Sequence, residues 1–115
     1  MQDLRSQFNK EFLKMIKRGI SNGNFTFCDS RLKNRLYLIK KGIENPYNFV
    51  RQTILELKED DYYSGPEPSN TGKKDDIYVF RKNIDDDEVY IKVAYKIEGN
   101  NIYVTCISFH EWRLI

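Results

Sequence analysis

Apolar and polar side chains alternate along two runs near the end of the sequence, residues 88–98 and 102–112. Such alternation is typical of strands with one buried face. Between the runs lies Gly99-Asn100-Asn101, and both Gly and Asn tolerate the positive φ that hairpin loops often need. We predict a β-hairpin with a three-residue loop here, because this loop length separates an apolar face from a polar one.

On the polar face of this hairpin, Tyr90 is expected opposite His110, and Lys92 opposite Ser108. His110 is the only histidine in the chain. A two-residue or four-residue loop would mix polar and apolar side chains on both faces. The sequence therefore predicts a polar surface displayed to solvent. The opposite face is expected to supply a core from Val89, Ile91 and Val93 against Ile107 and Phe109.

Two helices are expected from apolar spacing and from end signals. Apolar residues recur at steps of three and four along residues 2–18, and Gly19 is a plausible C-terminal stop. Asn45 followed by Pro46 has the pattern of an N-cap and a first-turn proline. This pattern predicts a helix that runs to about Leu57.

A further helix is expected between these two, over roughly residues 31–41. Asp29 or Ser30 is a candidate cap for its N-terminus, and Gly42 a candidate end. Basic residues recur along this segment, so the helix presents positive charge to solvent. Its apolar residues are expected to face inward: Leu32, Leu36 and Ile39.

The remaining segments complete an α+β fold. Residues 25–27 have the alternation of a short edge strand, and residues 77–82 have that of a longer strand. Residues 58–74 are rich in Gly, Pro, Ser and charge, which indicates a long loop, and residues 83–87 indicate an acidic turn. We therefore predict one domain over residues 1–115, with N-terminal helices packed on a three- to four-stranded antiparallel sheet.

Composition narrows the class of protein without identifying it. At 115 residues, with 40% hydrophobic and 14% aromatic residues, the chain is long enough and apolar enough for one folded domain. No apolar run approaches the length that spans a bilayer, and no signal peptide is recognisable. Cys28 and Cys106 fit neither a metal site nor a disulfide framework. We expect a cytoplasmic protein with reduced thiols and without a membrane partner.

Charge is divided unevenly along the chain. Residues 1–52 hold 11 Lys or Arg and 4 Asp or Glu, whereas residues 53–115 hold 8 and 13. A basic helical half suggests a polyanion or an acidic partner, although solvated Lys-rich helix faces explain the same asymmetry. Residues 31–41 are the expected surface for RNA or for an acidic protein.

The predicted polar face has the chemical parts for RNA cleavage without a metal or cofactor. The His110 imidazole can exchange protons with a ribose hydroxyl near neutral pH. Lys92, with Arg81 on the preceding strand, can stabilise a phosphate in its transition state, and Ser108 can contact it. Tyr90 can stack on an unpaired base or donate a hydrogen bond. No zinc spacing, phosphate loop or EF-hand pattern offers a rival chemistry.

Four segments, in this order along the chain, resemble the MqsR family of toxins from type II toxin–antitoxin systems. They are residues 59–66, 76–80, 88–93 and 107–110. The resemblance implies a fold related to RelE-like ribonucleases and an mRNA interferase that cuts single-stranded mRNA without a metal. It also implies a cognate antitoxin protein that neutralises the activity.

The family resemblance also implies roles for single residues. Tyr63 matches a tyrosine of the family's Asp-Phe-Tyr-Lys segment, and Tyr90 matches the active-site tyrosine of a following strand. Lys92 matches a lysine in the same strand. This chain departs from the pattern at Ser64, where the family has a lysine, and at His110, which replaces another lysine. A histidine therefore stands where the family has a lysine as possible proton carrier.

Two alternatives to a ribonuclease remain open from the sequence. The first is a non-enzymatic inhibitor on the same fold, whose acidic residues 59–61 and 85–88 occupy the nucleic-acid site of a partner. The second is an RNA-binding module without turnover. Cleavage would distinguish the ribonuclease from both, and salt-sensitive binding without cleavage would indicate the RNA-binding module.

Overall fold

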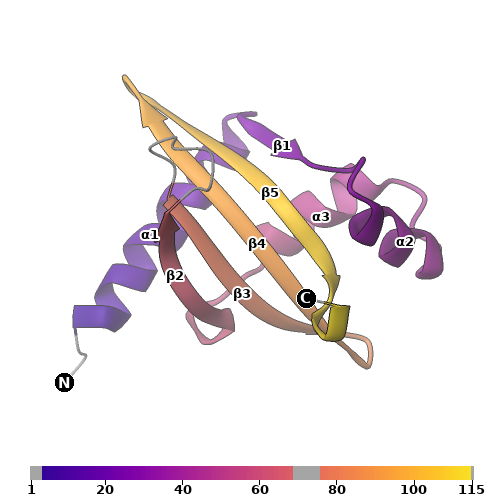
Figure 1. The fold of residues 1–115 in the computed structure, drawn as a ribbon. Coiled ribbons are helices and arrows are strands. Elements are labelled where there is room, and N and C mark those ends of the chain that lie inside the picture. Colours follow the sequence, from indigo (N-terminus) through magenta and orange to yellow (C-terminus); the bar gives the residue numbers. More distant parts are fainter. Residues whose placement is uncertain (1–3, 69–75, 115) are drawn as a thin grey trace.

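The computed structural model describes residues 4–68 and 76–114, which form three helices and a five-stranded sheet (Figure 1). The elements in chain order are α1 (Leu4–Ser21), β1 (Phe25–Phe27), α2 (Leu32–Lys40), α3 (Pro46–Leu55), the 3-10 turn η1 (Glu59–Asp61), β2 (Tyr62–Pro68), β3 (Asp76–Ile84), β4 (Asp87–Glu98), β5 (Asn101–Glu111) and the 3-10 turn η2 (Trp112–Leu114). The strand order is β1-β5-β4-β3-β2. The α+β prediction is confirmed.

The sheet is larger than predicted and mixed rather than antiparallel. β1 pairs with β5 in parallel, and the other neighbours are antiparallel. The additional strand β2 forms at the sheet edge, inside residues 58–74, which were predicted as a loop. An edge tolerates Pro66 because a proline has no amide to donate. Gly65 lets the chain approach closely, since a Cβ there would lie 2.7 Å from the Ile77 carbonyl oxygen. Residues 69–74 lie outside the described residues.

α1 and α3 cover one face of the sheet and form the core with it (Figure 1). Ile16 of α1 and Ile54 of α3 are fully buried, as are Val89 and Ile91 of β4. The apolar spacing therefore predicted the buried face of α3 and that of α1 from residue 10 onward, while the side chains of residues 4–9 lie outside the described part of the chain. The Asn45 side chain accepts a hydrogen bond from the Asn48 amide at the start of α3, which confirms the predicted cap.

Gly19 does not end the first helix, which continues to Ser21. The residue is needed instead for packing, because a Cβ at Gly19 would lie 2.8 Å from the Ile102 carbonyl oxygen of β5. The turn after α1 contains Gly23, whose φ of +86° is easily reached only by glycine. Close contact between a helix and a strand therefore explains a glycine that the sequence indicated as a stop.

α2 is rotated relative to its predicted orientation. Leu32, Leu36 and Ile39, expected inward, are exposed. Asn34, Tyr37 and Leu38 are buried instead. The Tyr37 ring and Leu38 pack in the hydrophobic core, and the polar atoms of Asn34 and Tyr37 bond to strands. Asn34 bonds to the backbone of β5, and the Tyr37 hydroxyl donates to Asp87 at 3.1 Å. Its N-cap is Arg31, which makes no side-chain capping bond, so the predicted caps Asp29 and Ser30 were also wrong.

The β4–β5 hairpin has a two-residue loop, Gly99-Asn100, because Glu98 pairs with Asn101. The predicted three-residue loop was therefore wrong. Farther along, Ile107 is bulged out between the pairs Val93–Cys106 and Lys92–Ser108. A bulge inserts one residue into one strand, so it restores the register that a longer loop would have produced. Beyond it, β5 has the predicted pairing.

Candidate functional site

A cleft of about 530 Å³, which we call the polar cleft, lies between the first turn of α2, the N-terminal half of β4 and the C-terminal end of β5. It is on the face of the sheet opposite α1 and α3. Its walls come from segments more than fifty residues apart in the chain. The lining residues are Arg31, Leu32, Lys33, Asn34, Tyr90, Lys92, Ser108 and His110.

The strands bring together all four residues of the predicted polar face. Tyr90 is paired with His110, and Lys92 with Ser108, as the sequence predicted. The Tyr90 and His110 ring centroids are 5.4 Å apart. Alternation along β4 sends Val89 and Ile91 into the core and these polar residues into the cleft.

The polar face of the hairpin is more buried than the sequence predicted. His110 is only 4% exposed and Ser108 only 5%, whereas the sequence predicted that both are displayed to solvent. The first turn of α2 stands beside the edge of β5 and covers them. Tyr90 and Lys92 on β4 are half-buried. The imidazole therefore lines a cleft instead of an open surface.

The surroundings of His110 fix its tautomer and lower its pKa. Its Nδ1 lies 2.9 Å from the Glu111 carbonyl oxygen. A carbonyl oxygen only accepts hydrogen bonds, so Nδ1 carries the proton and Nε2 has the free lone pair. Burial lowers the pKa of His110, and the nearby Lys33 and Arg31 charges lower it further, while the Glu111 bond acts in the opposite direction. The imidazole is thus a neutral base at pH 7.

The first turn of α2 adds positive potential to the polar cleft. Within the described residues, its N-cap Arg31 provides no side-chain hydrogen bond to the turn. The first amides of a helix have no partner inside the helix, and the helix dipole gives this end a partial positive charge. Arg31 and Lys33 lie on this turn, and Lys92 faces it from β4. Such an end is suited to an anion.

Asn34 holds this turn against β5. Its Nδ2 donates to the Ile107 carbonyl at 3.0 Å and to the Cys28 carbonyl at 2.9 Å, and its Oδ1 accepts from the Phe109 amide at 2.8 Å. β1 ends at Phe27, which pairs with Cys106. The Asn34 side chain therefore continues the pairing of the β5 edge where the strand stops.

The other end of α2 is attached to the β3–β4 turn. The Lys41 ammonium pairs with Asp85 at 2.8 Å and with Asp87 at 3.1 Å. Lys40 pairs with the buried Glu111 of β5, and Tyr37 bonds to Asp87. With Asn34 at the opposite end, α2 is fixed at two points, so the geometry of the cleft is set before any ligand arrives.

A row of aromatic rings leads away from His110 across the open face of the sheet. Tyr90 contacts Trp112 with centroids 5.2 Å apart, and Trp112 contacts Tyr63 at 4.7 Å. The Arg81 guanidinium lies 5.8 Å from the Trp112 ring. We call Tyr63, Trp112, Tyr90 and His110 the aromatic row. Single-stranded nucleic acids stack their bases on such platforms.

Two predicted substrate-binding residues therefore lie beside the polar cleft rather than in it. Tyr63 is exposed at the far end of the aromatic row. Arg81 is paired across the strands with Tyr90, and its side chain also bonds to Glu88 at 3.1 Å. Both adjoin Trp112 of the aromatic row, Tyr63 through its ring and Arg81 through its guanidinium.

Sequence reasoning missed two contributors to this site, Trp112 and Asn34. Trp112 follows His110 by two positions, and this spacing was a signal that the two share a face. Asn34 gave no such signal, because its role depends on tertiary contacts set by the orientation of α2. The first turn of α2 belongs to residues 31–41, which the sequence had indicated, on charge alone, as a surface for RNA or for an acidic protein.

Burial raises the pKa of Tyr90, and the nearby Glu67 raises it further, while Arg31 acts in the opposite direction. The phenol therefore keeps its proton through the physiological range and acts as a donor. Together, the polar cleft offers a neutral imidazole base, a phenol donor and several cations. This set can accept a hydroxyl proton and stabilise charge on a phosphate.

Among residues 4–68 and 76–114 no group of three His, Cys, Asp or Glu is arranged to hold a metal ion. Within the same residues no helix is long and apolar enough to cross a membrane. A scan against protein-family models gave no match for this chain, and a search of curated proteins gave none either. The resemblance to the MqsR family thus depends on the four sequence segments, and its RelE-like fold stays a prediction.

Proposed function

We propose that this chain is an endoribonuclease, an MqsR-like toxin that cuts single-stranded mRNA in the polar cleft. The observation that carries the proposal is the neutral His110 imidazole, with Nε2 free to accept a proton, beside Lys92 and the uncapped first turn of α2. A base next to an anion site is the minimum that RNA cleavage by the ribose hydroxyl requires.

The proposed reaction uses the 2′-hydroxyl of RNA as nucleophile. His110 Nε2 accepts its proton while the 2′ oxygen forms a bond to phosphorus. The bond from phosphorus to the 5′ oxygen breaks, and the Tyr90 phenol transfers its proton to that oxygen as it leaves. His110 then releases to solvent the proton it accepted, and Tyr90 regains one from solvent, so both groups return to their starting states. The products are a 2′,3′-cyclic phosphate and a 5′-hydroxyl. General acid–base catalysis typically contributes ~10²–10⁴ in rate.

Charge stabilisation completes the mechanism. Lys92, Arg31 and Lys33 line the cleft, and the N-terminal turn of α2 forms one of its walls. These groups stabilise the extra negative charge on phosphorus in the transition state. A single such donor is typically worth ~10²–10³ in rate. Ser108 lies opposite Lys92 and contributes a hydroxyl for orientation.

The aromatic row supports a single-stranded substrate. Its rings are available to stack only with bases that are not paired in a duplex. Arg81 and Tyr63 extend the row toward β2, so several nucleotides are held on one side of the scissile bond. We further propose that a cognate antitoxin protein restrains the enzyme, as the family resemblance implies.

The inhibitor alternative receives less support from the acidic residues 85–88. Lys41 pairs with Asp85 and Asp87, and Arg81 pairs with Glu88. A surface that imitates a nucleic acid needs free negative charge, whereas these carboxylates serve to attach α2 and the neighbouring strands. We therefore prefer the ribonuclease.

The test is cleavage of a labelled single-stranded RNA by the purified chain with a chelator present. We expect cyclic-phosphate products and a loss of at least about 10²-fold in rate for His110→Ala and for Lys92→Ala. Lys96→Ala is the matched control, since Lys96 is an exposed lysine on the same strand outside the cleft, and it should stay within about twofold. Intact RNA with wild type, or full activity in His110→Ala, would overturn the proposal.

Growth provides a second test of the same proposal. Induction of the wild-type chain in bacteria should arrest growth, and His110→Ala or Tyr90→Phe should relieve the arrest. If growth arrest persists in both variants at equal expression, toxicity does not depend on the residues of this cleft.

A further inference from the structure

The exposed side of α2 carries a stripe of large apolar side chains. Leu32 is 69% exposed, Leu36 55% and Ile39 69%. They are four and three residues apart, so they lie in one line over two turns of the helix. Exposed apolar residues are common singly, but a contiguous line of them indicates a surface for a partner. We call these three residues the apolar stripe.

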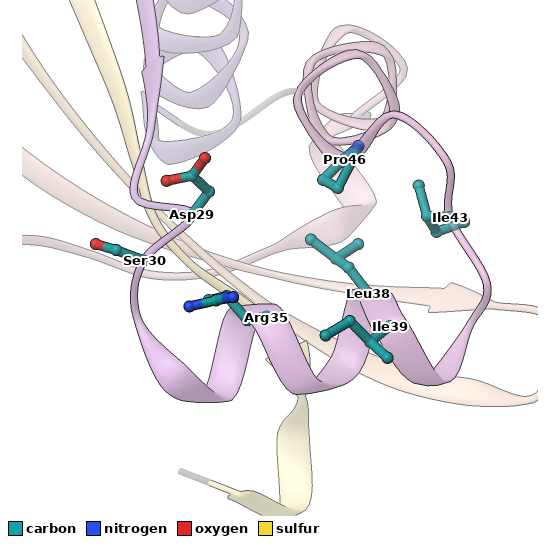
Figure 2. A pocket seen from close by; sticks show the side chains of 7 residues that line it. All are labelled: Asp29, Ser30, Arg35, Leu38, Ile39, Ile43 and Pro46. Carbon is teal, nitrogen blue, oxygen red and sulfur yellow. The ribbon is translucent and has the colours of Figure 1, made fainter.

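A groove beside the apolar stripe enlarges this surface. It has a volume of about 440 Å³ and lies between α2 and the start of α3 (Figure 2). Leu38, Ile39, Ile43 and Pro46 form its apolar side, and Arg35 projects at its other end together with Asp29 and Ser30 (Figure 2). Ile39 belongs to both the stripe and the groove, so the two form one continuous surface.

The charge around this surface is predominantly positive, although Asp29 also lines the groove. Residues 31–43 contain five Lys or Arg and no Asp or Glu. Lys40 is paired with Glu111 of β5, and Lys41 with Asp85 of the β3–β4 turn. Arg31 and Arg35, by contrast, form no ion pair within the described part of the chain, and both are exposed. The stripe therefore has guanidinium groups beside it that are available to a partner.

We propose that the apolar stripe and the groove bind an acidic amphipathic helix of a partner protein. Such a helix presents apolar residues at steps of three and four, which match two turns of α2. Carboxylates on its flanks would pair with Arg31 and Arg35, so that charge selects the partner and the apolar contacts hold it. This interaction goes beyond RNA cleavage and does not depend on it.

A second copy of the chain fits this surface poorly. Symmetric pairing of two α2 helices would bring the same arginines together, and like charges across an interface oppose association. The exposed residues of α1 include Lys14 and Arg18, and Lys14 is already paired with Glu11, so that helix has no free acidic face to offer. The complementary occupant is therefore a different, acidic chain.

A partner helix bound at this surface would extend to the polar cleft. Leu32 belongs to the apolar stripe and also lines the cleft. A helix seated along the stripe would extend past Leu32 to the cleft entrance, where its carboxylates would compete with RNA phosphates. This consequence, unlike the binding itself, rests on the proposed function.

Fluorescence anisotropy with a labelled synthetic peptide tests the binding without RNA. The probe is an acidic helical peptide of about five turns, with Leu at every third or fourth position and Glu elsewhere. The comparisons are the same residues in scrambled order and the same pattern with Lys in place of Glu. We expect the full-length chain to bind the acidic amphipathic peptide at least about tenfold more tightly than either comparison.

Variants of exposed residues locate the site. Leu36→Asp should weaken binding at least about tenfold, and Arg35→Glu should weaken it and reduce its salt dependence. Ile97→Asp is the control, because Ile97 is an equally exposed apolar residue near the β4–β5 loop, and it should bind as wild type does. Circular dichroism verifies that each variant is folded.

Two results would overturn the proposal. One is equal binding of the scrambled peptide, or of the Leu36→Asp variant, because either shows attraction by charge alone. The other is a chain that forms dimers by itself in sedimentation experiments and becomes monomeric with Leu36→Asp, since a second copy would then occupy the stripe. If the chain binds the peptide but does not cleave RNA, the docking proposal stands and only the proposed ribonuclease function is contradicted.

Discussion

The Asn34 side chain occupies the place of a neighbouring strand beside Phe109. Its Oδ1 accepts a hydrogen bond from the Phe109 amide at 2.8 Å, while its Nδ2 donates to the Ile107 carbonyl two residues earlier. One residue of a helix thereby satisfies the exposed edge of β5 and determines where the first turn of α2 stands. The stability of the fold and the shape of the polar cleft thus depend on the same side chain.

Asn34→Ala should therefore affect both stability and activity. It leaves the Ile107 carbonyl, the Cys28 carbonyl and the Phe109 amide without this partner, and we expect the free energy of unfolding to fall by about 2–4 kcal/mol. RNA cleavage should fall as well, because the α2 turn is no longer fixed. Urea unfolding followed by circular dichroism measures the first effect. Asn48→Ala, at an exposed position, should change stability by less than about 0.5 kcal/mol.

The lowered pKa of His110 predicts the direction of two pH effects. Cleavage requires the neutral imidazole, so the rate should fall as pH decreases, with the inflection below the ordinary histidine value of about 6.5. A rate that is flat from neutral pH down to about 5 would contradict a role for His110 as base.

The same shift predicts how stability varies with pH. The native imidazole binds a proton less readily than the unfolded one, so the unfolded state takes up more protons below about pH 6.5. The contribution of His110 is therefore present above that pH and is lost as pH falls toward the lower native pKa. Urea titrations at several pH values measure the effect, and His110→Gln should reduce the pH dependence in this window.

Trp112 should contribute more to RNA affinity than to the rate of the cleavage step. Removing one stacking platform costs about 1–3 kcal/mol per base, so Trp112→Ala should weaken RNA binding by roughly 5- to 150-fold. Trp112→Phe keeps an aromatic face and should retain most of the affinity. Binding is measured with His110→Ala as the background, so that substrate is not consumed. Equal affinity of all Trp112 variants would show that bases do not stack on the aromatic row.

Gly19 gives a test of packing in which two effects oppose each other. A glycine in a helix interior is usually less favourable than alanine by about 1 kcal/mol, which predicts stabilisation by Gly19→Ala. The added Cβ, however, would lie 2.8 Å from the Ile102 carbonyl and 2.9 Å from the Val104 side chain. Because backbone cannot yield easily, we expect the clash to dominate and stability to fall by about 1–3 kcal/mol. Lys14→Ala, on the exposed side of α1, is the control.

Part of the site was predicted correctly through two errors that cancel. The loop at Gly99 is one residue shorter than expected, and the bulge at Ile107 adds that residue back. Tyr90 therefore meets His110 as predicted. The sequence did contain a signal for the bulge, since strict alternation from the buried Phe109 cannot also bury Val104 and Cys106.

The orientation of α2 shows why the remainder was not predictable. The apolar spacing predicted that Leu32, Leu36 and Ile39 face inward. The structure buries Asn34, Tyr37 and Leu38 instead. Asn34 and Tyr37 bond to strands that lie far away in the sequence. Apolar periodicity carries no information about such partners. Local signals, such as the Asn45 cap of α3, were reliable because their partners are a few residues away.

The short connection between β1 and α2 has a consequence for how this fold diversifies. Only residues 28–31 separate the end of β1 from the first turn of α2, and that turn forms one wall of the cleft. Insertions or deletions in this connection would move that wall relative to β4 and β5. They would also displace Asn34 from the Cys28 carbonyl to which it donates, so a change in the width of the entrance carries a cost in stability.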